Sequence, residues 1–246
     1  MRVLLVEDDL DLLNSTAYAL RRERFEVIEA RDGVQALHRW KVERPDLIVL
    51  DIGLPRQDGF HLLQRVRETS ATPVIVVTGR TDEQNIVRAF NLGADDLVAK
   101  PIVAKLLALK IRALLRRAAP VAVEASAPPV VLGDLRIDPE LQEVNWGGRY
   151  LRLTPTEFRT FHLLAANAGR TVTTSRLLAY VWGDQAGDLN ALRTHISHIR
   201  AKLNLRDARI GAAIVGVLGV GYRFDPGSPA EKDAADPRPA EAPTTN

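Results

Sequence analysis

Short apolar segments alternate with amphipathic segments through the first half of the chain. The apolar segments are rich in Val, Ile and Leu, whereas the segments between them repeat apolar positions every three or four residues, as helices do. Strands are predicted at residues 3–6, 27–29, 47–50, 74–77 and 97–99, and helices at residues 10–22, 34–42, 60–67, 82–91 and 106–117. This alternation predicts an α/β domain over residues 1–117, with a five-stranded parallel sheet covered by helices on both faces.

The pattern changes after residue 117. Residues 118–129 contain three prolines and no hydrophobic period, which is typical of a linker. From Val130 onward the apolar segments become short strands, and Gly147-Gly148 is a turn signal between two of them. A second domain is therefore predicted over residues 130–225.

Helices and a terminal hairpin complete this second, α+β domain. Thr154, Pro155 and Glu157 have the spacing of an N-cap, a first helical residue and the acidic partner of a capping box. Further helices are predicted at residues 174–182 and 190–203, followed by a hairpin within residues 214–224. Residues 226–246 contain few large apolar side chains, so a disordered tail is expected there.

Composition restricts the class of protein without choosing one. The 246 residues are 46% apolar and 26% charged, an ordinary balance for domains that fold in water. The sequence has no cysteine, which excludes disulfides and thiolate metal sites. The first residues do not resemble a signal peptide and no apolar segment reaches membrane-spanning length, so a cytoplasmic protein with no membrane partner is expected. A net charge of +2 does not by itself indicate a nucleic-acid partner.

Carboxylates gather at one edge of the predicted sheet. Glu7, Asp8 and Asp9 follow the first strand directly, and Asp51 follows the third. In a parallel sheet the groups beyond the carboxyl ends of the strands lie at the same edge. Clustered carboxylates repel one another unless a cation lies between them, and Mg²⁺ is a small ion that prefers oxygen ligands. The sequence therefore predicts a magnesium site at this edge.

A hydroxyl and an ammonium group are expected at the same edge. Thr78 ends the fourth strand and Lys100 ends the fifth. Taken singly, an Asp after a strand is more often a cap residue, and a Lys-Pro pair is more often a surface feature. Taken together, an anionic oxygen, a divalent cation and a lysine are the groups needed to receive a phosphoryl group, because this transfer depends on positioning and charge neutralisation.

The first half resembles the flavodoxin-like receiver domain of response regulators. The matching motifs are Glu7-Asp8-Asp9, Asp51 with Leu54-Pro55 and Asp58-Gly59, Thr78-Gly79-Arg80, Gly93-Ala94-Asp95-Asp96 and Lys100-Pro101. The resemblance implies that a sensor histidine kinase phosphorylates Asp51. It further implies that Glu7, Asp8, Asp51 and the Gly53 carbonyl hold Mg²⁺, and that Thr78 and Lys100 contact the phosphoryl group.

The second half resembles the winged-helix DNA-binding domain of the OmpR/PhoB family. The matching motifs are residues 153–158, Val181-Trp182-Gly183, residues 195–203 and residues 219–224. In the last long helix Leu192, Ile196, Ile199 and Leu203 form one apolar stripe, which leaves the other side free. The resemblance places this helix in the major groove of promoter DNA. The residues it assigns to the bases are Arg193, Thr194 and His198, and those it assigns to the backbone are His195, Ser197 and Arg200.

The spacing of His195 and His198 also suggests a zinc site, but the sequence offers no third ligand that converges with them. His162 lies on a different predicted helix. Contact with solvent or phosphate is therefore the preferred interpretation of both histidines.

Several residues depart from the receiver family at its dimer face. Leu97 replaces the usual switch aromatic, and Ile86 and Leu106 replace a basic residue and a glutamate that pair across the dimer. Asp96, Lys110 and Arg117 keep charges suited to the rest of that face. Two interpretations stay open: a homodimer that forms partly without phosphate, or a repacked face with ordinary switching. In the second domain Leu218 replaces an arginine that often reaches the minor groove, so we expect either a modest DNA affinity or a DNA affinity that depends more on dimerisation.

The main prediction is a non-enzymatic two-component response regulator whose partners are a sensor kinase, promoter DNA and RNA polymerase. One alternative is a regulator of the same fold whose dimerisation and DNA binding are largely independent of phosphorylation. A less favoured alternative is a Mg²⁺-dependent phosphatase of the haloacid dehalogenase type. Such enzymes need a second Asp two residues after the nucleophile, where this chain has Gly53.

Overall fold

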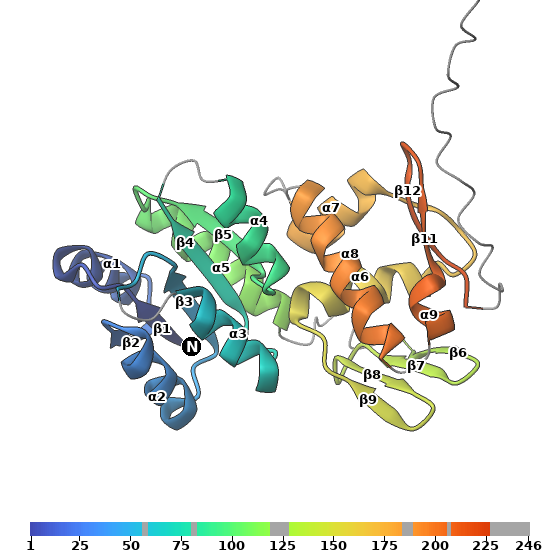
Figure 1. Cartoon of the computed structure of the whole chain (residues 1–246), viewed down its shortest axis with the longest axis horizontal. Coiled ribbons are helices and arrows are strands. Elements are labelled where there is room, and N and C mark those ends of the chain that lie inside the picture. Colours follow the sequence, from blue (N-terminus) through green and yellow to red (C-terminus); the bar gives the residue numbers. More distant parts are fainter. Residues whose placement is uncertain (56–58, 80–82, 119–127, 184–188, 206–207, 227–246) are drawn as a thin grey trace, which may run out of the picture.

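The computed structural model describes residues 1–55, 59–79, 83–118, 128–183, 189–205 and 208–226. Figure 1 shows two units side by side, an α/β unit at the N-terminal end and a unit of small sheets and helices at the C-terminal end. Most of the predicted linker (residues 119–127) and nearly all of the predicted tail (residues 227–246) lie outside the described residues.

The N-terminal unit is the predicted parallel α/β domain. Its five-stranded sheet has the order β2-β1-β3-β4-β5, and all four neighbouring pairs are parallel. The elements are β1 (Arg2–Val6), α1 (Leu10–Arg22), β2 (Glu26–Ala30), α2 (Gly33–Glu43), β3 (Leu47–Asp51), α3 (Gly59–Thr69), β4 (Val74–Thr78), α4 (Glu83–Asn91), β5 (Asp96–Ala99) and α5 (Ala104–Ala118). The predicted elements are confirmed, with ends that differ by one or two residues.

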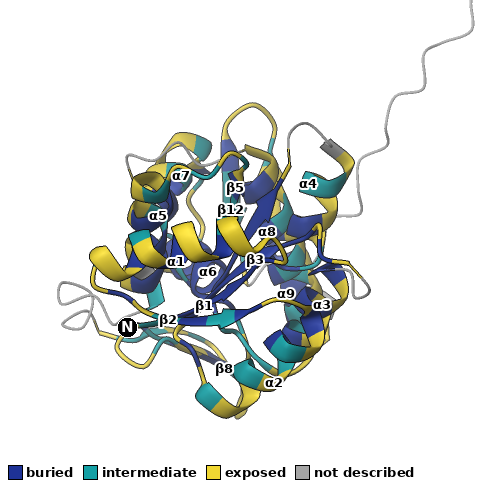
Figure 2. Cartoon of the chain, turned by 90° about the vertical axis from the view of Figure 1, so that its left-hand side faces the viewer, coloured by how far each residue is buried: buried dark blue, intermediate teal, exposed yellow. Residues whose placement is uncertain are grey.

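Alternating side chains on the strands build a core on each face of this sheet. Val3 and Leu5 of β1 pack with Leu13 of α1 and Ile111 of α5 in one apolar cluster. Leu4 and Val6 belong to the cluster on the other face, which includes buried side chains of α2, α3 and α4. Because successive side chains of a strand point to opposite faces, every residue of the central strands β3 and β4 is buried (Figure 2).

The C-terminal unit is the predicted α+β domain. A four-stranded antiparallel sheet comprises β6 (Val130–Leu132), β7 (Leu135–Asp138), β8 (Glu143–Trp146) and β9 (Arg149–Leu151). The helices are α6 (Pro155–Ala166), α7 (Thr174–Trp182), α8 (Leu189–Asn204) and α9 (Ala208–Ala212). A three-stranded sheet contains β10 (Val172–Thr173), β11 (Ile214–Val217) and β12 (Gly221–Phe224) in the order β10-β12-β11. The short elements β10 and α9 were not predicted.

Local sequence signals explain where the helices of this unit begin. The Thr154 side chain accepts a hydrogen bond from the Glu157 backbone N–H, and the Glu157 carboxylate accepts one from the Thr154 backbone N–H. The predicted capping box is therefore confirmed. The predicted terminal hairpin is also confirmed, because β11 and β12 pair in antiparallel fashion from Ile214 to Phe224.

The two units pack directly against each other. Helix α4 contacts α8, and α5 contacts α6 (Figure 1). One apolar cluster extends through both units and includes Phe90 of α4 and Ile196 of α8. The helix predicted to contact DNA thus lies against the α/β domain. Among the helices described, none is long and apolar enough to cross a membrane.

Candidate phosphorylation site and DNA-contacting helix

The predicted acidic site forms at the carboxyl ends of β1 and β3. Glu7 and Asp8 directly follow β1, and Asp51 is the last residue of β3. One carboxylate oxygen from each of Glu7, Asp8 and Asp51 lies within 4.8 Å of the other two. Glu7 and Asp51 are buried, whereas Asp8 is exposed. Oxygen ligands at this spacing fit a hard divalent cation such as Mg²⁺.

Lys100 lies directly against two of these carboxylates. Its Nζ is 2.7 Å from Asp51 Oδ2 and 2.9 Å from Glu7 Oε2. Burial alone would lower the pKa of Lys100, but hydrogen bonds to Asp51 and Glu7 outweigh that effect and raise the pKa. For Glu7, desolvation by burial is the largest influence and raises the pKa, against the opposing hydrogen bond from Lys100. Lys100 is therefore held as a cation inside the carboxylate cluster.

Gly53 and Thr78 complete the predicted set. The Gly53 backbone N–H donates a hydrogen bond to Asp51 Oδ1 at 2.9 Å, which fixes the acceptor side chain from the loop after β3. Thr78 is buried at the end of β4, and its hydroxyl donates to its neighbour, the Gly79 carbonyl, at 3.2 Å. The hydroxyl is thus at the correct sheet edge but is directed toward the backbone.

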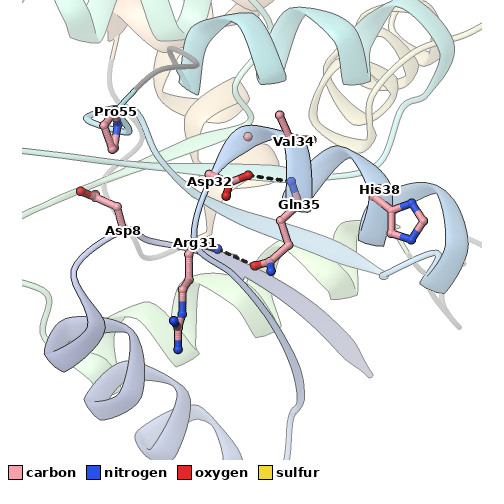
Figure 3. A pocket seen from close by; sticks show the side chains of 8 residues that line it. Asp8, Arg31, Asp32, Val34, Gln35, His38 and Pro55 are labelled. Carbon is pink, nitrogen blue, oxygen red and sulfur yellow. Dashed lines mark hydrogen bonds between the residues drawn. The ribbon is translucent and has the colours of Figure 1, made fainter.

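A groove leads from solvent to this cluster. It has a volume of about 750 Å³, and Asp8 and Pro55 line it together with residues at the start of α2. Figure 3 shows Asp8 on one wall, and Asp32 and Gln35 with their capping hydrogen bonds on the other. Asp8, which is the exposed member of the cluster, therefore connects the site to the solvent.

The predicted DNA-contacting helix is α8. Its apolar stripe is confirmed, because Leu192, Ile196, Ile199 and Leu203 are all buried in the C-terminal core. Arg193 and Ser197 are exposed, and Thr194 is half-buried. The Arg193 side of the helix faces the β11–β12 hairpin, and a groove of about 540 Å³ between them is lined by Leu189, Arg193 and Leu218 among others.

Three of the predicted DNA-contacting residues make contacts inside the protein. The Arg200 guanidinium donates two hydrogen bonds to the Ile214 carbonyl, at 2.7 and 3.0 Å, and so joins α8 to β11. His198 Nε2 is 2.9 Å from the Asn91 carbonyl at the end of α4. His195 is 1% exposed and lies against the rings of Phe90 and Trp182.

The expectation of contact with solvent or phosphate is therefore wrong for His195, which is buried, whereas His198 is half-buried and keeps part of its side chain exposed. Burial lowers the pKa of His195 to about 4, and burial also lowers the pKa of His198. The sequence pattern could not reveal this, because His195 lies beside the apolar stripe and its cover comes from the other domain. Glu157, which sequence reasoning treated only as a capping residue, also contacts Lys202 and approaches His198.

The predicted dimer face lies on α4, β5 and α5. Lys110 Nζ and Asp96 Oδ1 form an ion pair at 2.8 Å within this face. Ile86 and Leu97 are half-buried and pack against the core, whereas Leu106 is exposed. The side chain of Arg117 lies outside the described part of the chain. Because α4 belongs to this face and also contacts α8, the effector domain occupies part of the predicted dimer face.

Comparison with known proteins agrees with this geometry. The family described as a response regulator receiver domain matches residues 3–112, and the family described as the C-terminal part of transcriptional regulatory proteins matches residues 148–224. A parallel α/β domain with a clustered carboxylate site, joined to a winged-helix domain, defines a two-component response regulator that controls transcription. The chain belongs to the OmpR/PhoB family of these regulators.

Named relatives extend over nearly the whole chain. The chain is 33% identical over 232 residues to the transcriptional regulatory protein ResD of Bacillus subtilis, covering 92% of this chain and 97% of ResD. It is 37% identical over 226 residues to the sensory transduction protein RegX3 of Mycolicibacterium smegmatis, covering 91% and 98%. A solved mutant of RitR shares the fold, with a TM-score of 0.75 at 24% identity over 91% of this chain and 98% of that one. ResD and RegX3 favour the response-regulator interpretation over both alternatives, and the likeness to RitR shows the fold alone.

Proposed function

We propose that Asp51 accepts a phosphoryl group from the histidine of a sensor kinase, and that Glu7, Asp8, Asp51 and the Gly53 carbonyl hold Mg²⁺. The observation that carries this proposal is the cluster of Glu7, Asp8 and Asp51 oxygens within 4.8 Å, with Lys100 Nζ 2.7 Å from Asp51. When bound, Mg²⁺ supplies charge neutralisation for the phosphoryl oxygens. The protein itself needs no enzymatic activity beyond accepting and losing this group.

The side chains of the site have distinct roles in this transfer. The Gly53 N–H orients Asp51 so that one carboxylate oxygen can form the new P–O bond as the bond from phosphorus to the kinase histidine breaks. Lys100, which is already paired with Asp51, then forms a charge-assisted hydrogen bond to a phosphoryl oxygen. The Thr78 hydroxyl leaves the Gly79 carbonyl and donates to a phosphoryl oxygen instead. Phosphorylation replaces the single negative charge of the Asp51 carboxylate by a charge of about −1.5 to −2 and brings additional acceptor oxygens, which draws both groups inward.

Helix α4 connects this site to the DNA-contacting helix. Thr78 ends the strand that precedes α4, and the other end of α4 holds α8 through Phe90 and Asn91. We infer that phosphorylation moves α4, releases α8 and leaves α4 available for a homodimer. The dimer then forms through a face that contains Ile86, Asp96, Leu97, Leu106, Lys110 and Arg117.

Released α8 enters the major groove of promoter DNA. Arg193 and Ser197 are already exposed and His198 is half-buried, whereas His195 becomes accessible only after α4 leaves. Thr194 contributes to the same surface, and Arg200 holds the helix against β11. A dimer on DNA can then recruit RNA polymerase. The expected cellular location is the cytoplasm, where sensor kinase domains and DNA are both accessible.

The test uses a small phosphodonor, acetyl phosphate, with Mg²⁺. Wild-type protein should gain the mass of one phosphoryl group and bind more tightly to a DNA fragment that it selects from a random pool. Asp51→Ala should do neither, and Asp134→Asn, an exposed aspartate of the second domain, should behave as wild type. Equal phosphorylation of Asp51→Ala would refute the acceptor assignment. Full DNA binding by unphosphorylated Asp51→Ala would instead support phosphorylation-independent regulation.

A further inference from the structure

Three potential metal ligands converge where the two domains meet. Glu157 comes from α6, and His195 and His198 come from successive turns of α8. One ligand atom from each lies within 4.8 Å of the other two. None of the three belongs to the phosphorylation site, which lies at the carboxyl ends of β1 and β3.

His195 provides the first independent sign of a missing ligand. The ring is 1% exposed, and neither Nδ1 nor Nε2 has a hydrogen-bond partner among the residues that the structure describes. A buried polar group without a partner is costly, because it loses its hydrogen bonds to water and gains nothing in return. A metal ion bound to one ring nitrogen would remove this cost.

His198 is already oriented as a metal ligand. The Asn91 carbonyl can only accept a hydrogen bond, so Nε2 of His198 carries the proton and donates it. Nδ1 then has a free lone pair, and it lies 3.7 Å from Glu157 Oε1. Two ligands of a tetrahedral zinc ion, each about 2.0 Å from it, are themselves about 3.3 Å apart. A backbone carbonyl that fixes the second ring nitrogen is a common outer-shell partner of ligating histidines.

Glu157 keeps one oxygen available for an ion. Its Oε2 accepts the Thr154 backbone N–H at 2.8 Å and contacts Lys202 Nζ. Its Oε1 is the atom that faces His198. The site is open at one side, because the side chains of His198 and Lys202 are 21% and 33% exposed. Water can therefore enter as a fourth ligand.

We propose that Glu157, His195 and His198 form a site for a divalent transition-metal ion of the zinc type. Two imidazole nitrogens and one carboxylate oxygen suit Zn²⁺ rather than Mg²⁺, which prefers oxygen ligands alone. The Asn91 hydrogen bond connects a ligand of this site to α4, so a bound ion stabilises the arrangement in which α4 covers α8. In that arrangement Zn²⁺ opposes DNA binding, a consequence that rests on the proposed function.

The binding test is calorimetric titration of the full chain with Zn²⁺ in millimolar Mg²⁺, which keeps the carboxylates near Asp51 filled. One equivalent should bind to wild type, and at least tenfold more weakly to His198→Gln and to His195→Phe. His61→Asn, which removes an exposed histidine of α3, is the matched control and should bind as wild type. Lys202→Met should bind more tightly, because it removes a cation that competes for Glu157.

Two results would overturn the site. One is unchanged Zn²⁺ binding by His198→Gln. Position 198 is half-buried, so this variant should fold, and circular dichroism and thermal unfolding check that it does. The other is loss of Zn²⁺ binding only in Asp8→Asn, which would place the ion at the phosphorylation site. Phenylalanine at position 195 preserves the packing against Phe90 and Trp182, so His195→Phe should remain folded.

DNA binding separates this inference from the proposed function. With acetyl phosphate present, Zn²⁺ should weaken DNA binding by wild type several-fold and should have little effect on Glu157→Gln, which removes a metal ligand that is not a predicted DNA contact. If Zn²⁺ binds but leaves the DNA affinity of wild type unchanged, the link between the site and the closed arrangement is refuted. If phosphorylation itself does not raise DNA binding, the proposed function fails whatever Zn²⁺ does in the calorimeter.

Discussion

Lys100 neutralises two buried carboxylates, so its removal should destabilise the receiver domain in a way that Mg²⁺ repairs. In Lys100→Met, Glu7 and Asp51 lose the ammonium that lies 2.9 and 2.7 Å from their oxygens. The two carboxylates then repel each other across a pocket that offers them little water. A divalent cation bound to the same oxygens would supply the missing positive charge.

The size of the effect follows from burial. Removing one partner of a fully buried ion pair costs about 3–5 kcal/mol. The Lys100 side chain is 27% exposed, and the groove at Asp8 admits solvent, so we expect about 2 kcal/mol. For a domain of this size, about 4 °C of melting temperature corresponds to each kcal/mol, so the loss is about 8 °C. Mg²⁺ at one hundred times its Kd adds about 2.7 kcal/mol to a protein that binds it only when folded.

The assay is thermal unfolding of both proteins in EDTA and in saturating Mg²⁺. The difference in Tm between wild type and Lys100→Met should be large in EDTA and small in Mg²⁺. In wild type the Lys100 ammonium must move before Mg²⁺ can bind the carboxylates, so Mg²⁺ should stabilise Lys100→Met more than it stabilises wild type. Lys105→Met, an exposed lysine of α5, is the control and should lower the Tm in neither condition. A difference that is the same with and without Mg²⁺ would show that Lys100 acts through packing and not through charge.

Three further substitutions have definite expected results. Gly59→Ala should cost about 1–3 kcal/mol and slow phosphorylation by acetyl phosphate, because the new Cβ would lie 2.5 Å from the Asp51 carbonyl oxygen. Arg193→Ala should leave unfolding unchanged and relax base preference at one position of a selected DNA site, at a cost of about 1–3 kcal/mol for the preferred base. Arg200→Ala should lower both the stability of the effector domain, by about 1.5 kcal/mol, and its affinity for all DNA sequences, because Arg200 anchors α8 to the Ile214 carbonyl.

Each of these expectations has its own control and its own contrary result. Gly216→Ala adds a Cβ with only an ordinary contact to Tyr222, so it should phosphorylate as wild type. Equal loss of affinity for selected and random DNA in Arg193→Ala would remove its role in base recognition. Unchanged unfolding of Arg200→Ala would mean that its two hydrogen bonds contribute nothing to the anchoring of α8.

Local patterns in the sequence were sufficient for most of the fold and for the cluster of carboxylates at the candidate phosphorylation site. The proximity of Glu7 and Asp51 could be predicted because the carboxyl ends of parallel strands lie at the same edge of a sheet, whatever the details of packing. The helix start at Thr154 was predictable because a capping box is determined by four consecutive residues. In both cases the decisive information lies within one element or in the order of elements.

Contacts between elements that are distant in the sequence could not be predicted in this way. The burial of His195 depends on Phe90, which lies on another domain, and no periodic pattern relates the two residues. Arg200 is a residue type that commonly contacts phosphate, but here it donates to the Ile214 backbone carbonyl. Every residue has a backbone carbonyl, so the sequence does not indicate which one Arg200 contacts. The convergence of Glu157 with His198 similarly results from the packing of α6 against α8, which the sequence pattern does not specify.

In the proposed function, helix α4 leaves α8 before it pairs with a second receiver domain. On that proposal, release of the DNA-contacting helix and assembly of the dimer would be parts of one equilibrium, and by mass action a rise in protein concentration would shift it toward the DNA-binding form. A promoter read by this protein would then respond to how much regulator the cell makes as well as to how much of it is phosphorylated. If such a regulator activated its own gene, an earlier stimulus would leave the protein at a higher concentration. The competition for α4 would then make a later response stronger at the same degree of phosphorylation.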